Sequence, residues 1–598
     1  MTASEDRLYL GIMTGPHDPS AAIVRNGEVL ALVDEERFIR DKHAFDRFPL
    51  RAIASCLQIA GATLDDIHAI AMPWDIAAHS DGRMAAFYDA LSTEWSVDRA
   101  TREWQQKQLR TFSEDALRER LSRELRVGLG AHDTPAIVGP GHHRSHAVQA
   151  GYESPFRDAL VVVLDGSGDH HSGTVWSKRG PELELRHEVL LPHSLGWFYA
   201  AVTEYLGFAS SDGEYKVMGL AAFGKRNPTL RALVDQVLLE GDDSLSYRLD
   251  PKFIHYGQHS FSGRFTDDLV DLFGHPPRTH GEELEPWHMD LAFAAQEAVE
   301  DAVVRLVEWG VRTTGIHSVA LGGGVAMNVK ANARVAASDD VEAVFAHPGC
   351  ADNGAAAGAA LAACMDDGAG IPHPIQSIAL GPSFTEKEVA AILKSVGAVA
   401  ETVEDVGAAV AWELVAGRVV GWFSERMEAG SRALGHRSIL ADPRSLKSRD
   451  RVNAVIKHRE PWRPFGPSMP AEVVDRYTDD IGDARFMTIA FRANDRLRNE
   501  APAVVHVDGT SRIHAVVAEE NPNYYRVLAE FGRLTGVPIV LNTSFNLAGE
   551  PIVCTPVDAL RTFWSSGLDV LALGHHMLRK PRPPAVEFSN EGGAVWQK

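Results

Sequence analysis

The chain has 598 residues, a length that exceeds one hydrophobic core and indicates three to four domain-sized units. Its residues are 45% hydrophobic and 23% charged, as in an ordinary globular protein. The net charge of −22 argues against a nucleic-acid partner, and is compatible with a cationic small substrate or simply with solubility. The first residues lack signal-peptide features, the apolar runs are too short for a membrane, and the four cysteines lack disulfide or metal-ligand spacing. We therefore expect a cytoplasmic protein with no membrane partner.

Apolar runs separated by glycine-containing turns occur twice in the first half of the chain. The first set predicts three strands, two of them joined at Asn26-Gly27: Leu8–Met13, Ser20–Val24 and Val29–Val33. The second set predicts strands at Leu160–Leu164 and Gly173–Trp176 around the turn Asp165–Asp169. This weak internal repeat indicates two related α/β halves that face a cleft.

The segment before the second set carries paired histidines. His142 and His146 are four residues apart, so on a helix they share one face and can hold one metal ion. Asp165 ends the next predicted strand and adds a carboxylate. Two imidazoles and one carboxylate make a metal site with open positions, whereas paired histidines alone are more often surface or capping residues.

Four further segments are notable within the first 384 residues. Gly322, Gly323 and Gly324 lie between a predicted strand and a helix, where glycine permits close approach of a ligand. Two charged stretches, about 77–130 and 242–286, have helical patterns in whole or in part. They are either peripheral scaffolding or a lid that binds an acceptor. Residues 371–384 are predicted to connect two domains.

The second half contains a concentration of basic residues with few acidic neighbours. Phosphate groups are bound by arginine forks and lysine charges, and serine or asparagine can add hydrogen bonds. The alternative is that these cations form salt bridges with Glu428 and Glu460. We favour a phosphate site over this alternative. The basic residues and their polar neighbours include Arg432, Lys457, Arg463, Arg512 and Ser544.

Taken in order, the motifs of the chain resemble those of O-carbamoyltransferases, the group that includes the tobramycin, cephalosporin and nodulation-factor enzymes. The resemblance covers nearly the whole chain. The matching motifs are Gly15-Pro16-His17-Asp18, Glu35-Glu36-Arg37-Phe38, His142-His143-x-x-His146, Asp165-Gly166, the stretch Gly213–Leu220, His347-Pro348-x-x-x-Asp352-Asn353-Gly354, the stretch Ser431–Gly435, and Asn542-Thr543-Ser544-Phe545-Asn546. A local departure is that Pro16 and Pro19 bracket His17, which stiffens this turn.

This resemblance implies an α/β fold. Residues 1–370 would form a duplicated domain of the actin and sugar-kinase type, like the tRNA threonylcarbamoyl transferase, and residues 385–598 a YrdC-like domain. It also implies two reactions: ATP with Mg²⁺ and carbamoyl phosphate would yield carbamoyl adenylate in the C-terminal domain, and the N-terminal domain would pass the carbamoyl group to a hydroxyl of a small natural product, such as an antibiotic.

The resemblance also assigns residues to these reactions. His17 would deprotonate the acceptor hydroxyl. The ligands of Fe²⁺, or of another divalent metal, would be His142, His146, Asp165 and Asp352. The nucleotide cleft of the N-terminal domain would be lined by Lys42, Glu214, Lys216, Gly219 and Gly322–Gly324. Carbamoyl phosphate and ATP would be bound in the C-terminal domain by Arg432, Lys457, Arg463, Arg512 and Ser544.

Two other functions remain open on the sequence. A tRNA threonylcarbamoyl-type enzyme shares both kinds of domain, but the charge of −22 counts against a nucleic-acid substrate. An ATP-regulated binding protein without catalytic activity would not need the complete set of His, Asp and Arg residues. The acceptor and the oligomeric state are not predicted.

Overall fold

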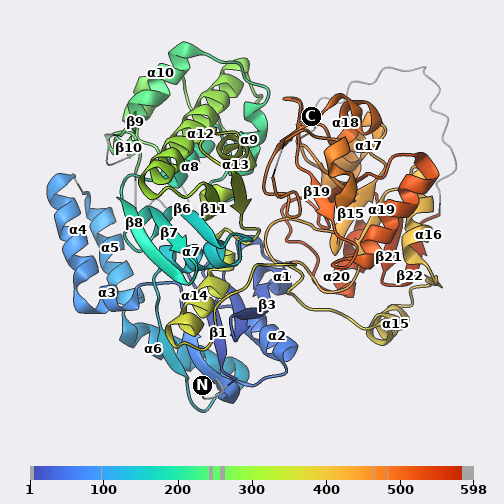
Figure 1. Ribbon diagram of the computed structural model, residues 1–598, viewed down its shortest axis with the longest axis horizontal. Coiled ribbons are helices and arrows are strands. Elements are labelled where there is room, and N and C mark those ends of the chain that lie inside the picture. Colours follow the sequence, from blue (N-terminus) through green and yellow to red (C-terminus); the bar gives the residue numbers. More distant parts are fainter. Residues whose placement is uncertain are drawn as a thin grey trace.

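A computed structural model describes residues 6–95, 97–241, 247–255, 263–460, 462–480 and 482–581. Elements up to α14 lie on one side of the molecule and elements from α15 onward lie on the other (Figure 1). Among the described residues, no helix combines the length and apolar character needed to span a membrane.

The first sheet is built from the N-terminal strands, and it confirms the three predicted from sequence. Its order is β3-β2-β1-β4-β5, with antiparallel pairs β1–β2 and β2–β3 and parallel pairs β1–β4 and β4–β5. The strands are β1 (Leu8–Met13), β2 (Ser20–Arg25), β3 (Glu28–Asp34), β4 (Ile67–Ala71) and β5 (Ala136–Val138). Between β3 and β4 lie α1 (Glu36–Ile39), η1 (Lys42–Ala44), α2 (Leu50–Ala60) and η2 (Leu64–Asp66).

The second sheet repeats this plan, because its order β8-β7-β6-β11-β12 has the same pattern of antiparallel and parallel pairs. The duplicated α/β arrangement expected for this part of the chain is therefore present. One strand differs from the prediction: β6 continues past Asp165, with irregular pairing between Leu164 and Gly168. The strands are β6 (Asp158–Gly168), β7 (His171–Arg179), β8 (Glu182–Leu190), β11 (Ser318–Gly322) and β12 (Ala343–Ala346).

Two buried helices, α7 (His142–Tyr152) and α14 (Asp352–Asp366), lie between the two sheets and pack against each other. α14 packs on β1 and β2, and α7 packs on β6 and β11. The close approach requires small residues, since a Cβ on Gly358 would lie 2.2 Å from the carbonyl oxygen of Ser145. Asp352 and His142 both lie at the N-terminal ends of their helices, facing the site described below.

The remaining elements of the N-terminal part surround this centre. The stretch 77–130 is helical as predicted and forms α3 (Ile76–Asp81), α4 (Arg83–Glu94), α5 (Arg99–Thr111) and α6 (Glu114–Leu129). The stretch 242–286 contains β10 (Tyr247–Leu249) and α11 (Asp267–Phe273), and part of it lies outside the described residues. The others are α8 (Leu195–Tyr205), α9 (Glu214–Ala221), α10 (Pro228–Val237), β9 (Leu238–Glu240), α12 (Pro286–Thr314), η3 (Gly324–Met327) and α13 (Val329–Ala336).

The C-terminal part is a mixed α/β structure around an eight-stranded sheet, in the order β13-β22-β21-β14-β15-β20-β16-β19. Its strands are β13 (Glu401–Thr402), β14 (Val420–Phe423), β15 (Arg437–Ala441), β16 (Gly466–Pro470), β19 (His514–Val516), β20 (Val540–Ser544), β21 (Val570–Leu573) and β22 (His576–Arg579). A separate pair is β17 (Phe491–Arg492) with β18 (Thr510–Ser511). The helices are α15 (Glu386–Ser395), α16 (Val406–Val415), α17 (Leu446–Arg451), η4 (Val452–Lys457), η5 (Ala471–Arg476), α18 (Asp495–Glu500), η6 (Pro502–Val504), α19 (Pro522–Thr535) and α20 (Pro556–Ser565).

Arginine side chains form hydrogen bonds between the N-terminal and C-terminal parts. Arg37 Nη2 donates to the carbonyl of Gly430 at 2.6 Å, and Arg426 Nη2 donates to the carbonyl of Leu30 at 2.9 Å. The connection between α14 and α15 has no helix or strand, and its Leu380 carbonyl accepts from Leu32 of β3. The two parts therefore meet over a hydrogen-bonded interface, which positions their facing surfaces.

Candidate functional site

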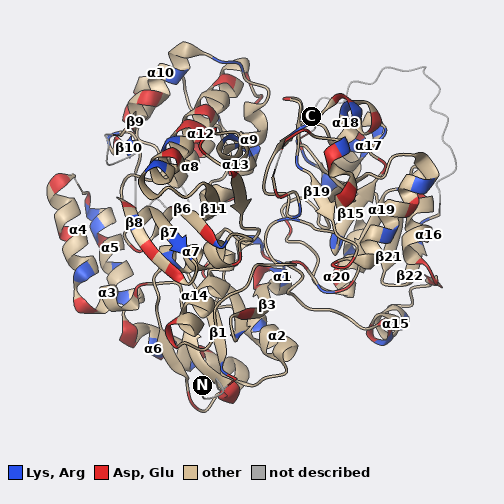
Figure 2. Cartoon of the chain, viewed as in Figure 1, with Lys and Arg blue, Asp and Glu red and all other residues tan. Residues whose placement is uncertain are grey.

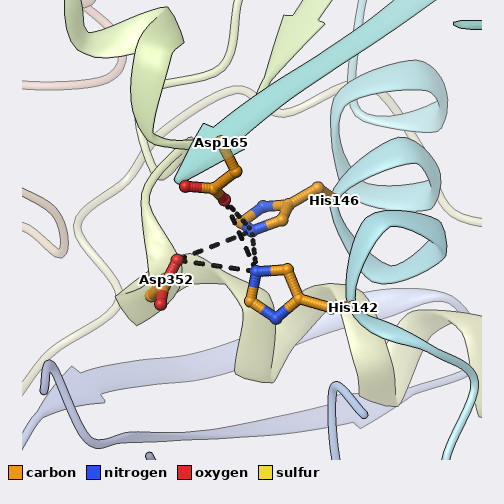
Figure 3. A group of neighbouring side chains, drawn as sticks. All are labelled: His142, His146, Asp165 and Asp352. Atoms are coloured by element: carbon orange, nitrogen blue, oxygen red, sulfur yellow. Dashed lines mark hydrogen bonds and ion pairs between the residues drawn. The ribbon is translucent and has the colours of Figure 1, made fainter. Parts of the chain in front are cut away.

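Four predicted metal ligands converge where α7, α14 and β6 meet (Figure 3). His142 and His146 lie one turn apart on α7, with their Nε2 atoms 3.2 Å from each other. Asp165 Oδ2 is 3.4 Å from both Nε2 atoms, and Asp352 Oδ1 is 3.6 Å from that of His142. One ligand atom from each residue lies within 4.8 Å of the others. The four groups can therefore bind a single ion.

The donor set fits a divalent transition metal. Ligands in neighbouring coordination positions about 2.1 Å from a metal are about 3.0–3.4 Å apart, close to the distances seen here. The Nδ1 of His142 faces the carbonyl of Pro73 at 3.2 Å, which fixes the ring with Nε2 toward the cluster. Although burial lowers it, the hydrogen bonds and charges of Asp165 and Asp352 raise the pKa of His142 well above its usual range. The same negative field favours a cation.

His17 lies beside this cluster, in the turn after β1. Its Nδ1 is 2.9 Å from Asp18 Oδ2, and its Nε2 is 3.9 Å from Asp352 Oδ2. Burial lowers the pKa of His17, but the hydrogen bond to Asp18 and the charges of Asp18 and Asp352 outweigh this effect and raise it to about 8. Hydrogen bonds hold both prolines that flank this turn. The carbonyl of Pro16 accepts from the backbone amide of Asp46, and the carbonyl of Pro19 accepts from the backbone amide of Glu35. The turn is thus held firmly.

A chain of charged groups extends from His17 to Lys42. Asp18 also faces Nδ1 of His43 at 2.8 Å, and its backbone has a positive φ of 51°. Nε2 of His43 is 3.5 Å from Asp212 Oδ1, and the same oxygen accepts from Nζ of Lys42. Burial lowers the pKa of His43, but hydrogen bonds to Asp18 and Asp212 raise it to about 10. The predicted base and the predicted nucleotide-binding lysine therefore belong to one network.

The other predicted nucleotide residues lie in different surroundings. Glu214 accepts from the backbone amides of Ser211 and Gly213, and burial raises its pKa. Lys216 instead points to the C-terminal part, with Nζ 3.7 Å from Glu460 Oε1. Gly323 serves packing, since its φ is 81° and a Cβ would lie 2.3 Å from the Leu164 carbonyl oxygen.

The predicted phosphate residues of the C-terminal part gather around Lys457 and Ser544. Nζ of Lys457 donates to the Ser544 carbonyl at 2.5 Å and to Asn546 Oδ1 at 2.6 Å. Burial, followed by the charges of Arg459 and Arg463, lowers the pKa of Lys457 well below its usual range. Lys457 is thus held by neutral oxygens among other cations.

Four arginines complete this group, which we call the arginine cluster: Arg432, Arg459, Arg463 and Arg512. Burial and the charges of the other three lower the pKa of Arg512 well below its usual range. Arg463 lies over the ring of Tyr215 at 4.5 Å and 3.7 Å from Glu460 Oε2, so the alternative of salt bridging holds in part. Crowded cations repel one another unless an anion lies between them, and guanidinium forks suit phosphate oxygens. The cluster is therefore suited to phosphate groups.

A single cavity of about 1160 Å³ joins the two sites. Its lining includes His17, Asp165 and Asp352 on one side and the arginine cluster with Lys457 and Ser544 on the other. Lys42, Glu214, Gly219 and Gly324 also line it. His142, His146, Lys216, Gly322 and Gly323 are not among the lining residues, and the two histidines are buried behind Asp165 and Asp352. Figure 2 shows both basic and acidic residues on helices of both parts.

Several residues of the site were not predicted as functional. Asp18 is adjacent to His17 in the matching motif, and its position there was the available signal. Asp212 precedes the Gly213–Leu220 motif, and Arg459 lies in the basic run of Lys457 to Arg463. Tyr215 lies within the Gly213–Leu220 motif, which was the available signal, whereas His43 has no pattern of its own and is brought to the site by folding.

Comparison with known proteins identifies the family. Two family models match, the carbamoyltransferase N-terminus over residues 8–361 and the carbamoyltransferase C-terminus over residues 411–580. A YrdC-like fold of the C-terminal part is consistent with the second match.

Relatives match over much of the chain. The protein sll1178 of Synechocystis sp. is 36% identical over 98% of both chains. The nodulation protein NolNO of Sinorhizobium fredii is 35% identical over 96% of this chain and 80% of its own. The 3′-hydroxymethylcephem-O-carbamoyltransferase of Streptomyces clavuligerus is 34% identical over 40% of this chain and 44% of its own. Among solved structures, T. kodakarensis HypF has a TM-score of 0.29 at 14% identity, covering 61% of this chain and 48% of its own. On the two family models and these relatives, the chain belongs to the carbamoyltransferase family of transferase enzymes.

Proposed function

We propose that the protein is an ATP-dependent O-carbamoyltransferase that makes carbamoyl adenylate at the arginine cluster and uses it beside His17. The observation that carries this proposal is the shared cavity of about 1160 Å³, which both groups of residues line. An acyl adenylate is an activated donor that water destroys, so a protected path between the two sites limits its loss. Family membership supports the transfer reaction itself.

In the first reaction, water cleaves carbamoyl phosphate to carbamate and phosphate. A carbamate oxygen then attacks the α-phosphorus of ATP bound with Mg²⁺, and pyrophosphate leaves. Arg432, Arg463 and Arg512 would hold the phosphate oxygens, with Lys457 and Ser544 adding donors. Preorganised cations of this kind stabilise the negative charge of phosphoryl transfer.

In the second reaction, the acceptor oxygen attacks the carbamoyl carbon, the bond to the AMP phosphate breaks, and His17 takes the proton. Asp18 holds Nδ1 of His17, so that Nε2 faces the cavity side at Asp352. His142, His146, Asp165 and Asp352 would hold a divalent metal, Fe²⁺ by family resemblance, which supplies positive charge to polarise the carbonyl or neutralise the AMP phosphate. Lys42 and the wall at Glu214 and Gly219 would bind the nucleotide.

Pyrophosphate release from ATP that depends on carbamoyl phosphate tests the proposal. We expect the wild type to show it, His17→Ala to retain it while losing carbamoyl transfer, and Arg463→Ala to lose it. Matched controls are His68→Ala and Arg492→Ala, whose side chains are 42% and 82% exposed. If both site variants lose the same half-reaction, the assignment of two sites is wrong.

The same assay separates the alternatives. A threonylcarbamoyl-type enzyme would release pyrophosphate with threonine and bicarbonate instead of carbamoyl phosphate, and would modify tRNA. A binding protein without catalytic activity would release none with either set of substrates.

A further inference from the structure

A second group of possible metal ligands lies where β6 turns into β7. His170 is in the turn and His171 is the first residue of β7, and their rings are 3.9 Å apart. Nε2 of His171 is 2.6 Å from Oε1 of Glu188, which belongs to the neighbouring strand β8. One ligand atom from each of the three residues lies within 4.8 Å of the others. We call these three residues the hairpin cluster. None of them lines the cavity, and the mechanism above does not use them.

The backbone holds the hairpin cluster in place. Asp169, the other residue of the turn, has a positive φ of 54°, which aspartate tolerates. Its buried carboxylate accepts from the backbone amide of His142 at 3.0 Å, which fixes the turn to the start of α7. Leu190 of β8 pairs with His171, and residues two apart on a strand share a face, so Glu188 lies diagonally opposite His171 on that face. The three side chains are therefore brought together by the fold of the hairpin.

The chemistry of the hairpin cluster suits a transition metal. Two imidazoles and one carboxylate, with positions left open for water, are a common ligand set for such ions. Within the described part of the chain, no lysine or arginine lies within ion-pair distance of Glu188, so only imidazoles balance its charge. The side chains of His171 and Glu188 are 16% and 44% exposed. An ion can therefore reach them from solvent, and small rotations of the side chains can bring the ligand atoms to bonding distance.

A buried imidazole adjoins the cluster. The ring of His143, on α7, is 5.5 Å from that of His171, close to the 4.8 Å between the rings of His142 and His146 at the first metal site. Nδ1 of His143 faces Thr174 Oγ1 at 3.2 Å, whereas its Nε2 is buried and has no hydrogen-bond partner among the residues that the structure describes. Buried polar atoms without a partner are rare, and an ion bound nearby is one physical explanation for them. A cation beside His171 would supply that explanation for His143.

We propose that the hairpin cluster binds a second divalent transition-metal ion of the Zn²⁺ class, with His143 as a further nitrogen beside it. Imidazole ligands favour such an ion over Mg²⁺ and Ca²⁺, which prefer oxygen ligands. Fe²⁺ binds nitrogen ligands more weakly than Zn²⁺ does, so one equivalent of Fe²⁺ would fill the buried four-ligand site first. The inference does not rest on the proposed function, because the cluster lies outside the cavity lining.

Zinc binding by the full-length protein tests the inference. The protein is freed of metal with a chelator and dialysed to equilibrium against a series of Zn²⁺ concentrations, and its zinc content is measured by elemental analysis. We expect about two ions per chain in the wild type, one in each site. Glu188→Gln and His171→Gln should each weaken the binding of one ion by about tenfold or more, because even a group that only orients a ligand contributes about 10–100-fold to metal affinity. Glu188→Gln should have the same effect in the His146→Ala background, because the two sites are separate.

Glu184→Gln is the matched control, because Glu184 is also on β8, is 64% exposed and pairs with Arg186 instead of a histidine. This variant should bind zinc as the wild type does. The inference is overturned if Glu188→Gln or His171→Gln binds as many zinc ions, and as tightly, as the wild type. Glu188 is an exposed side chain, so its variant keeps the test decisive even if His146→Ala does not fold.

Discussion

Asp18→Asn is the sharpest test of how the site positions His17. The Asp18 carboxylate faces Nδ1 of both His17 and His43, at 2.9 and 2.8 Å, so it can accept from two imidazoles at once. An asparagine has one acceptor oxygen and an NH₂ group, so one imidazole must change its tautomer or lose its partner. The substitution keeps the shape of the side chain, and asparagine tolerates the positive φ of 51° at this position.

The expected loss follows from one charge-assisted hydrogen bond. Such a bond contributes about 1.5–3 kcal/mol. A change of about 1.36 kcal/mol in the activation free energy changes a rate tenfold. The side chains of His17 and Asp18 are 27% and 24% exposed, which favours the lower part of this range. We therefore expect carbamoyl transfer to slow by about 10- to 50-fold.

The assay follows two rates in one reaction. Carbamoyl transfer to a hydroxyl acceptor is measured by mass spectrometry, and pyrophosphate release is measured alongside it. Only transfer should fall in Asp18→Asn. Asp290→Asn is the control, because Asp290 accepts from the backbone of Lys225 away from the cavity. Transfer within twofold of the wild type, or an equal fall in both rates, would refute the positioning role of Asp18.

Three further predictions concern the metal, the anion site and pH. His146→Ala should lower bound Fe²⁺, measured by elemental analysis after anaerobic loading, from about one ion per chain to a small fraction; retention of the ion would exclude His146 as a ligand. Arg512→Met should raise the melting temperature of the ligand-free protein by about 2–4 °C, because it relieves the repulsion between Arg512 and the other arginines of the cluster. It should also remove the further rise in melting temperature that pyrophosphate causes in the wild type. An unchanged pyrophosphate effect would exclude Arg512 from the anion site. Burial and the charge of His436 lower the pKa of His514 to about 3 in the folded protein. In the unfolded chain the pKa of this histidine is about 6.5, so below that pH the unfolded chain binds more protons than the folded protein. The free energy of unfolding therefore falls as the pH falls. His514→Gln should recover about 2 kcal/mol of that loss at pH 5 in denaturant titrations, and an unchanged pH dependence would contradict this cause.

Local patterns were sufficient for much of the fold. The strands around Asn26-Gly27 and the helix that carries His142 and His146 follow from turn residues and side-chain spacing over a few positions. The convergence of His142 and His146 was predictable for the same reason, because their separation of four residues places them on one face of the helix. Asp352 has no such local signal, since α14 brings it to α7 from about 200 residues away in the chain. The nucleotide-binding roles of Lys216 and Gly323 came from motif position and stay predictions. In the structure Lys216 lies 3.7 Å from Glu460, and Gly323 packs against β6.

The sequence by itself determined the class of the protein, the repeated strand plan and the types of side chain available for metal and phosphate binding, because these depend on composition and on neighbours along the chain. Only the tertiary structure decided that the arginine cluster and His17 share one cavity and that Asp18 links two histidines. These features arise where helices and strands from distant segments pack together, and no short stretch of sequence encodes the distances between them.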